Sequence, residues 1–418
     1  MEFLHFLMND VLSEPAILVG IIALIGLLAQ KKPVTECIKG TVKTIMGFVI
    51  LGAGAGLIVN SLGGFSTIFQ HAFSIQGVVP NNEAIVSIAQ KDFGREMAMI
   101  MFFAMIINIL IARFTPWKFI FLTGHHTLFM SMMVAVVLAM AGFNGILLVA
   151  IGSLIVGVSM VFFPAIIHPY MKKITGSDDV ALGHFSTLSY LLAGFIGSKL
   201  GNTSHSTEDM DVPKSLLFLR DTPVAISFTM AIIFMITCLF AGENFVEKVS
   251  GGKNWLIFAL MQSITFAAGV YIILQGIRMV IAEIVPAFKG ISDKLVPNSK
   301  PALDCTVVFP YAPNAVLVGF LSSFVAGIIG MLILYALNMT VIIPGVVPHF
   351  FVGAAAGVFG NALGGRRGAI LGAFAQGLLI TFLPVFLLPV LGSVGIANTT
   401  FSDADFGVIG ILLGIIIR

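Results

Sequence analysis

Long apolar stretches, separated by short groups of charged residues, run along nearly the whole chain. A helix needs about 20 apolar residues in succession to cross a bilayer, and several stretches reach that length without a charge. The pattern predicts ten crossings, at residues 15–30, 41–62, 96–113, 119–142, 146–170, 218–242, 254–282, 313–337, 368–390 and 405–418. The fourth and fifth are separated at Phe143, Asn144 and Gly145, which have turn character.

Four further apolar segments are too short or too broken to cross cleanly. They cover residues 65–92, 179–204, 284–304 and 340–365. In transporters, short segments interrupted by Gly and Pro often lie at the substrate site as re-entrant hairpins. Ordinary interfacial loops would show the same pattern. We expect an eleventh crossing within residues 340–365.

Composition narrows the class of protein. Hydrophobic residues make up 58 % and charged residues 10 % of the 418 residues, and the mean hydropathy is +1.05. Soluble domains usually carry about 25 % charged residues. The chain therefore cannot be a cytosolic enzyme, a secreted domain or a disordered protein, and an all-α polytopic membrane protein is predicted. The net charge of +2 offers no field for nucleic acid.

Basic residues indicate the orientation, because cytoplasmic loops of membrane proteins are enriched in Lys and Arg. The first loop carries Lys31, Lys32, Lys39 and Lys43, so it should be cytoplasmic and the N-terminus should lie outside. The chain ends on Arg418, directly after an apolar run, so the C-terminus should be cytoplasmic. An odd number of crossings is required, and eleven fits.

Asp304 is the most informative acidic residue. No further Asp, Glu, Lys or Arg occurs until Arg366. An ionisable side chain at membrane depth is costly and is tolerated mainly where it faces a cavity or a partner. Asp304 is therefore a candidate for the binding site. Alternatively, it caps a half-helix at the interface, and the two roles are compatible.

Three histidines are candidates for hydrogen bonding in a cavity. His125 and His126 are adjacent on a predicted helix and point about 100° apart, which argues against their sharing one metal ion. His184 lies in a short segment rich in Gly, Ser and Thr. Each could bind a hydroxyl-rich ligand, or could only satisfy packing or freed backbone groups.

Other polar breaks are less specific. Asn81, Asn82 and Glu83 resemble a solvated loop when taken alone, and His349 could line a pore or simply pack. The GxxxG patterns at 353–357 and 360–364 predict close helix contacts. No metalloprotease, nucleophile-elbow, phosphate-loop or kinase motif occurs. Catalysis by this chain alone is not expected.

Several short motifs together resemble a known family of membrane proteins. The sequence is similar to the membrane (IIC) subunit of the L-ascorbate phosphotransferase system, the UlaA/SgaT family, along nearly its whole length. The matching stretches are 38–48 (IKGTVKTIMGF), 122–125 (LTGH), 183–184 (GH), 275–279 (QGIRM), 288–292 (FKGIS), 303–305 (LDC), 312–316 (APNAV) and 357–359 (GVF).

The resemblance implies one integral-membrane IIC domain over residues 1–418, with no fused IIA or IIB domain and no cofactor. It implies a homodimer in a bacterial inner membrane, with eleven transmembrane helices per subunit, re-entrant hairpins and interfacial amphipathic helices. A substrate-holding core domain would move like an elevator beside a dimerising scaffold domain. L-ascorbate would be the substrate, and cytoplasmic IIA and IIB proteins would be the partners, with IIB carrying the phosphocysteine.

The resemblance also implies a set of ligand contacts. They fall at Asn82, Glu83, His125, His126, Thr127, Leu128, Phe129, His184, Phe185 and Asp304. Ascorbate carriers have Thr-Tyr in place of Asn82 and Glu83, and glutamines at the positions of Phe129 and Phe185. Because the loss of two amides changes how a polyhydroxylated ligand is bound, a related sugar acid or a polyol is an alternative substrate.

Asp304 would orient the substrate hydroxyl or accept its proton during phosphoryl transfer, for which positioning is the main requirement. Two other functions remain open. An ion-coupled secondary transporter would use Asp304, and its uptake would persist without the phosphotransferase carriers but collapse with an ionophore. An intramembrane enzyme would use His125 or His126 as a base, and the purified chain alone would form product.

Overall fold

The computed structural model describes residues 15–74, 77–210, 215, 218–219, 221–392 and 399–417. Within these ranges the chain is predominantly helical, and six helices are long and apolar enough to cross a membrane. They are Asn82–Phe114, Gly145–Thr175, Pro223–Ala241, Trp255–Ile272, Pro313–Ala336 and Val346–Val390. The protein is therefore a multi-pass membrane protein. Both termini, on which the predicted orientation depends, lie outside the described residues.

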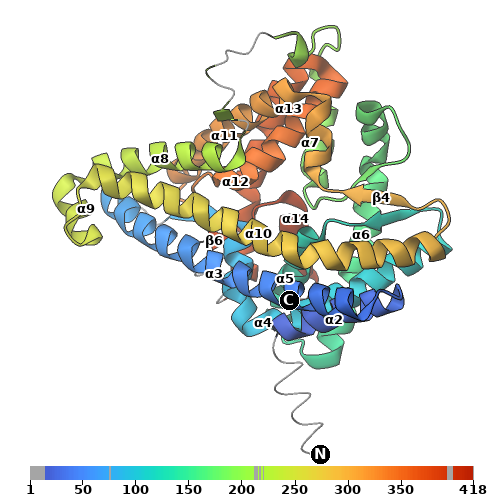
Figure 1. Cartoon of the computed structure of the whole chain (residues 1–418). Coiled ribbons are helices and arrows are strands. Elements are labelled where there is room, and N and C mark those ends of the chain that lie inside the picture. Colours follow the sequence, from blue (N-terminus) through green and yellow to red (C-terminus); the bar gives the residue numbers. More distant parts are fainter. Residues whose placement is uncertain are drawn as a thin grey trace, which may run out of the picture.

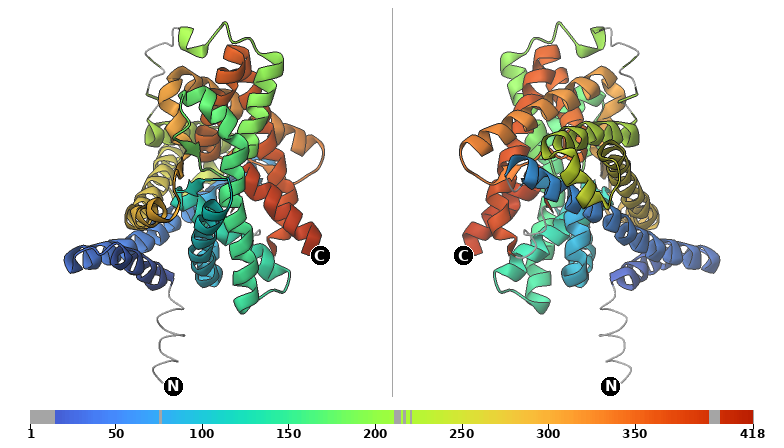
Figure 2. Two further views of the ribbon diagram at one scale, coloured as in Figure 1. Left: turned by 90° about the vertical axis from the view of Figure 1, so that its right-hand side faces the viewer. Right: turned by 90° about the vertical axis from the view of Figure 1, so that its left-hand side faces the viewer.

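One group of helices forms a layer on one side of the molecule (Figures 1 and 2). The helices α3 and α10 pack along each other, and α2 and α8 pack against both of them. Short α9 connects α8 to α10. The bounds are α2 Pro15–Ala29, α3 Val34–Phe73, α8 Thr222–Ala241, α9 Glu243–Ser250 and α10 Trp255–Leu295. We call these five helices the outer layer.

The remaining helices form a bundle beside the outer layer (Figure 2). Its closest pairs are α7 with α13, α11 with α13, and α4 with α5 and α6. The bounds are α4 Asn82–Phe114, α5 Gly124–Met140, α6 Gly145–Thr175, α7 Thr187–Leu200, α11 Pro313–Ala336, α13 Ala354–Leu387 and α14 Ala404–Ile417. Short turns of helix are η2 Thr207–Asp209, η4 Cys305–Tyr311, α12 Val346–Pro348, the π-helix η5 His349–Gly353 and η6 Leu388–Val390.

The predicted helix boundaries fit the bundle at two points. The turn expected at residues 143–145 falls between α5 and α6. The predicted segments 340–365 and 368–390 are separated at residues 366–367. The observed break lies directly before this point, at Gly364 and Gly365, where α13 has non-helical backbone and Gly365 has φ +60°. A residue with a side chain would be strained in that conformation.

Glycine lets three helices approach closely, as the GxxxG patterns predicted. A Cβ on Gly357 of α13 would collide with the backbone of Ala315 and Gly319 on α11. On the same helix, a Cβ on Gly364 would meet Gly197 of α7. Small residues at such contacts increase van der Waals packing, which replaces the hydrophobic effect between helices in lipid.

Within the described residues, six short strands depart from the all-α prediction. Each of the four broken segments contains one: β1 Gly77–Pro80, β3 Ala181–Leu182, β4 Lys300–Leu303 and β5 Val341–Ile342. Two more, β2 Phe119–Phe121 and β6 Thr399–Thr400, precede α5 and α14. Irregular backbone at membrane depth must be satisfied inside the protein, and pairing as strands achieves this.

The strands form two three-stranded parallel sheets, and each sheet combines the two halves of the chain. In one sheet the order is β5-β1-β6, so a strand of the first half lies between two of the second. The other sheet has the order β2-β4-β3, which is the reverse arrangement. Two representative registers are Val78 opposite Ile342 and Leu182 opposite Leu303. We call them the β1 sheet and the β4 sheet after their central strands.

Each strand leads within a few residues into a helix. The β1 sheet leads into α4, α12 and α14, and the β4 sheet leads into α5, α7 and η4. Because parallel strands present their carboxyl ends at one edge of a sheet, residues distant in sequence meet there. These two edges position the candidate site.

Candidate functional site

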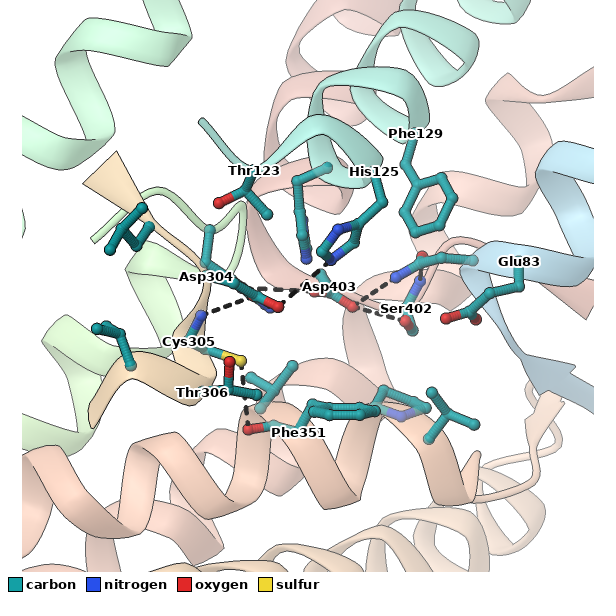
Figure 3. A pocket seen from close by; sticks show the side chains of 18 of the residues that line it. Glu83, Thr123, His125, Phe129, Asp304, Cys305, Thr306, Phe351, Ser402 and Asp403 are labelled. Atoms are coloured by element: carbon teal, nitrogen blue, oxygen red, sulfur yellow. Dashed lines mark hydrogen bonds and ion pairs between the residues drawn. The ribbon is translucent and has the colours of Figure 1, made fainter. Parts of the chain in front are cut away.

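A cavity of about 530 Å³ lies where the carboxyl ends of the two sheets meet. Its lining residues lie at or shortly after the ends of all six strands, with one exception, Arg278 from α10 in the outer layer. Ligand sites in sheets of parallel strands commonly lie outside the carboxyl ends. Figure 3 shows the side chains converging on this space from several elements.

The β4 sheet supplies a histidine-rich side. Asp304 directly follows β4 and accepts a 2.7 Å hydrogen bond from the backbone N–H of Cys305, so it does cap the following helical turn. One of its oxygens lies 3.6 Å from Nε2 of His125, and the other lies 3.6 Å from Nε2 of His184. The Asp304 side chain is 31 % exposed. The cap and the cavity position predicted for Asp304 are therefore compatible.

Hydrogen bonds fix the orientation of the two buried histidines. The backbone N–H of Phe185 donates to Nδ1 of His126 at 3.3 Å, which leaves Nε2 to carry the proton of the neutral ring. His184 lies with Nδ1 3.0 Å from the hydroxyl of Tyr190. The rings of His126 and His184 are only 3.7 Å apart between centroids. Both rings are thus held in place before any ligand binds.

The β1 sheet supplies an acidic side. The side-chain amide of Asn82 donates to Oδ1 of Asp403 at 2.8 Å, and its carbonyl oxygen accepts from the backbone N–H of Ser402 at 2.9 Å. The Ser402 hydroxyl also donates to Oδ1 of Asp403, at 2.7 Å. Glu83 lines the cavity next to this network and points toward it (Figure 3).

Asp403 is a cavity residue that the sequence reading missed. It is buried, lines the cavity, and its Oδ2 lies 3.8 Å from Nδ1 of His184. The signal was present in the polar group Ser402, Asp403 and Asp405, which separates two apolar runs as Asn82 and Glu83 do. Arg278, inside a stretch that carried the family resemblance, was also given no role.

The structure brings most of the predicted ligand residues together. Seven of them line the cavity: Asn82, Glu83, His125, His126, Phe129, His184 and Asp304. Thr127, Leu128 and Phe185 do not line it, although they are buried beside it. The Phe185 ring stacks on Phe121 at 4.7 Å between centroids, which places it in the packing behind the histidines.

His349, whose role was open, belongs to a separate buried network. Its Nδ1 lies 2.7 Å from the hydroxyl of Ser323, which donates to the side-chain oxygen of Gln376. This network joins α11, η5 and α13. It holds the π-helix, and both Phe351 within this helix and Pro348 directly before it line the cavity.

Metal-ligating atoms also gather in the cavity. Three overlapping groups have their ligand atoms within 4.8 Å of one another, namely His125 with His126 and Asp304, His126 with His184 and Asp403, and His184 with Asp304 and Cys305. Nδ1 of His126 and His184 already have hydrogen-bond partners. The same side chains suit the hydroxyls of a polyhydroxylated ligand, because imidazole and carboxylate both form such hydrogen bonds.

A second polar cluster surrounds Asp178, which follows the end of α6 and lies outside the candidate spans. Oδ1 of Asp178 lies 2.7 Å from Nζ of Lys172, Nζ of Lys300 and Nε2 of His168. Hydrogen bonds from Lys172 and Lys300, and then from His168, lower the pKa of Asp178 well below its ordinary value. Because Lys300 begins β4, this cluster ties the β4 sheet to α6.

Known proteins are similar to this chain in sequence. Residues 10–405 match the family model for EIIC-GAT, described as the sugar-specific permease component of the PTS, the phosphotransferase system. One relative is the "Ascorbate-specific PTS system EIIC component" of Mycoplasma pneumoniae, 26 % identical over 419 residues, which cover 87 % of this chain. This chain spans 63 % of that relative's length. The chain belongs to the EIIC-GAT family of sugar-specific PTS permease components.

Proposed function

We propose that this chain is the translocating subunit of a phosphotransferase system and imports a small polyhydroxylated compound that is phosphorylated on arrival. L-ascorbate is the first candidate, because the resemblance implies it and the mycoplasma relative is named for it. The observation that carries the proposal is the cavity between the two sheet edges, where imidazoles and carboxylates suit hydroxyl groups. The ligand contacts are the seven predicted residues that line it, together with Asp403.

The arrangement of helices supports an elevator-type movement. The bundle carries every lining residue except Arg278, which belongs to the outer layer. The cavity therefore lies at the junction of two helix groups, and movement of one group past the other would change its access. In this proposal the bundle is the core domain, the outer layer is the dimerising scaffold domain, and eleven segments cross a bacterial inner membrane.

Phosphorylation is proposed to come from a separate IIB protein that itself receives phosphate from IIA. In this arrangement Asp304 faces the bound hydroxyl group and orients it for attack on the phosphocysteine. His125 and His184 hold the opposite sides of the ligand, since both approach Asp304 through Nε2. Positioning is the main requirement for phosphoryl transfer, so the chain itself needs no nucleophile.

The test measures uptake of labelled substrate by cells that express the chain with its IIA and IIB proteins. We expect phosphorylated substrate to accumulate only when both carriers are present. His125→Ala and His184→Ala should abolish accumulation, whereas His205→Ala, on an exposed loop, should not. Uptake that persists without carriers and collapses with an ionophore would overturn the proposal in favour of ion coupling through Asp304.

A further inference from the structure

A groove on the surface of the bundle has no part in the proposed function. It has a volume of about 590 Å³ and lies between α4 and the first turns of α6. Its α4 side consists of Arg95, Met99, Phe103 and Ile107, which are four residues apart and therefore share one face of the helix. Its α6 side consists of residues within 145–153. The groove shares no lining residue with the cavity between the two sheets.

The length of the groove matches one leaflet of a bilayer. Ile107 follows Arg95 by 12 residues, which is about 18 Å along a helix, and half of a hydrocarbon core is about 15 Å thick. At the Ile107 end the two helices meet, because a Cβ on Gly157 would lie 2.6 Å from the Ile107 side chain. The hydroxyl of Ser153 already donates to the carbonyl of Val149. The groove between its two ends is therefore suited to one acyl chain.

Two opposite charges, those of Arg95 and Glu96, line the other end of the groove. Gly145, the first residue of α6, lies at the same end, so this end is also an end of the α6 span. Charged residues at the ends of spans lie at the level of the lipid head groups. Within the described part of the chain, neither Arg95 nor Glu96 takes part in an ion pair. Lys91 and Asp92, one turn earlier, are exposed and do not line the groove.

This pair of charges distinguishes between lipid head groups. The guanidinium of Arg95 suits a phosphate, which it can bind through two parallel N–H groups. The carboxylate of Glu96 accepts hydrogen bonds and suits a primary ammonium. Phosphatidylethanolamine carries both groups. Phosphatidylcholine has a quaternary ammonium without an N–H group, and phosphatidylglycerol has no cation. Of these three head groups, only ethanolamine phosphate complements both side chains.

We propose that the groove between α4 and α6 binds a phospholipid with an ethanolamine head group. Its phosphate lies on Arg95, its ammonium lies on Glu96, and one acyl chain runs toward Ile107. The chain covers the side chains of Phe103 and Ile146, which are 39 % and 90 % exposed in the protein alone. The inference does not depend on the transported substrate. Because the lipid contacts two packed helices, its binding also stabilises the folded protein.

Three lipids with identical acyl chains test the head group. The purified full chain in detergent is titrated with phosphatidylethanolamine, phosphatidylcholine or phosphatidylglycerol, and native mass spectrometry measures the bound lipid. We expect phosphatidylethanolamine to bind at least about tenfold more tightly than either of the others, because each of them lacks one charge-assisted hydrogen bond. Equal or tighter binding of phosphatidylcholine or phosphatidylglycerol overturns the inference, and so does the absence of bound lipid in all three titrations.

Two charge substitutions test the roles of the two side chains. Arg95→Gln should weaken all three lipids, because each contains a phosphate. Glu96→Gln should weaken phosphatidylethanolamine alone and remove its preference over phosphatidylcholine. The matched controls are Arg113→Gln, on an exposed residue at the opposite end of α4, and Glu243→Gln, at the exposed start of α9. Neither control should change binding. A preference that survives in Glu96→Gln contradicts the proposed contact with the ammonium.

A bulky side chain tests whether the lipid lies in the groove. Ala150→Trp fills the space between the helices from the α6 side, and we expect it to abolish the selective binding of phosphatidylethanolamine. Ala268→Trp, on an exposed alanine of α10 outside the groove, is the matched control. Thermal unfolding shows whether each variant is folded, and the charge substitutions decide the question if Ala150→Trp is not. Unchanged lipid binding in a folded Ala150→Trp variant overturns the inference, and a simultaneous change of oligomeric state would identify the groove as a subunit interface.

Discussion

The two sheets supply the cavity with different chemistry although they have the same architecture. At the edge of the β4 sheet, His125 and His184 each lie 3.6 Å from Asp304, which is longer than a hydrogen bond, so a ligand can take up the hydrogen bonds of these three side chains. The edge of the β1 sheet presents Asn82 and Asp403, which are already joined at 2.8 Å. One edge is therefore open for binding, and the other is largely closed on itself.

This difference teaches how a polar site can exist inside an apolar protein. Buried polar groups are usually paired. At the β1 edge Asn82, Ser402 and Asp403 pair with one another, whereas among the described residues Oε2 of Glu83 and the hydroxyls of Thr399 and Thr400 have no hydrogen-bond partner. The β4 edge is paired less tightly, and it borders the more exposed part of the cavity, where His125 and Asp304 are 18 % and 31 % exposed. Substitutions at the two edges should therefore affect different properties.

The largest expected effect is a loss of substrate binding on substitution at the β4 edge. Asp304→Ala removes the carboxylate that faces both His125 and His184, and hydrogen bonds to charged groups contribute about 1.5–3 kcal/mol each. We expect substrate binding to weaken roughly a hundredfold, measured by equilibrium binding. Asp304→Asn keeps an acceptor for the Cys305 N–H and should weaken it less. Binding within threefold of wild type in the alanine variant would refute this role.

Substitution at the β1 edge, where the side chains are already paired, should lower the stability of the protein. Asn82→Ala removes one donor to Asp403 and one acceptor for Ser402, and we expect about 2 kcal/mol less stability toward unfolding. Thermal unfolding in detergent measures this. His125→Ala is the comparison variant and should lose binding with little loss of stability. If the two variants showed the opposite pattern, the division between edges would be wrong.

Two glycines, one beside the central strand of each sheet, test whether the two sheets are packed with equal density. A Cβ on Gly183 would lie 2.5 Å from the carbonyl oxygen of Ala302 in β4, and one on Gly345 would collide with that of Pro80 in β1. Each alanine substitution should destabilise the protein by about 1–3 kcal/mol through overpacking. Gly64→Ala, with only a ring carbon at 3.8 Å, is the control for thermal unfolding. If either sheet variant were as stable as wild type, the backbone of that sheet would be able to shift and accommodate the added methyl group.

The smallest effect concerns the pH dependence of the cluster beyond α6. Because its pKa is lowered in the folded protein from an ordinary value of 3.8, Asp178 contributes stability above that value. The contribution is lost as the pH falls toward the folded-state pKa. We expect wild type to be more stable than Asp178→Asn at pH 7, with a difference that shrinks below about pH 4. A difference that is independent of pH would exclude this linkage.

Much of the membrane architecture could be predicted because apolar length alone sets it. A span requires about 20 apolar residues, and the turn at residues 143–145 and the break near residue 365 were both visible as interruptions. The strands were not predicted because they have only two to four residues. Segments so short show no periodicity, and their pairing joins residues far apart in the chain.

The candidate site shows the same division. The polar breaks at Asn82, His184 and Asp304 were visible because a polar residue in an apolar run is conspicuous. Asp403 was equally visible as a residue, but nothing local indicated that it lies beside Asn82, 321 residues away. Conversely, Phe185 follows His184 directly and yet faces the packing behind it.

The sequence by itself determined that this is a polytopic membrane protein with a few costly polar residues at depth, because composition and apolar length are local properties. Only the tertiary structure decided that those residues meet at the edges of two sheets, each of which combines strands from both halves of the chain. Parallel pairing brings the ends of these distant strands together. It also decided which side chains remain available. Asn82 is hydrogen-bonded to Asp403 and Ser402, whereas Oε2 of Glu83, its neighbour in the chain, is buried without a donor from the part of the chain that the structure describes.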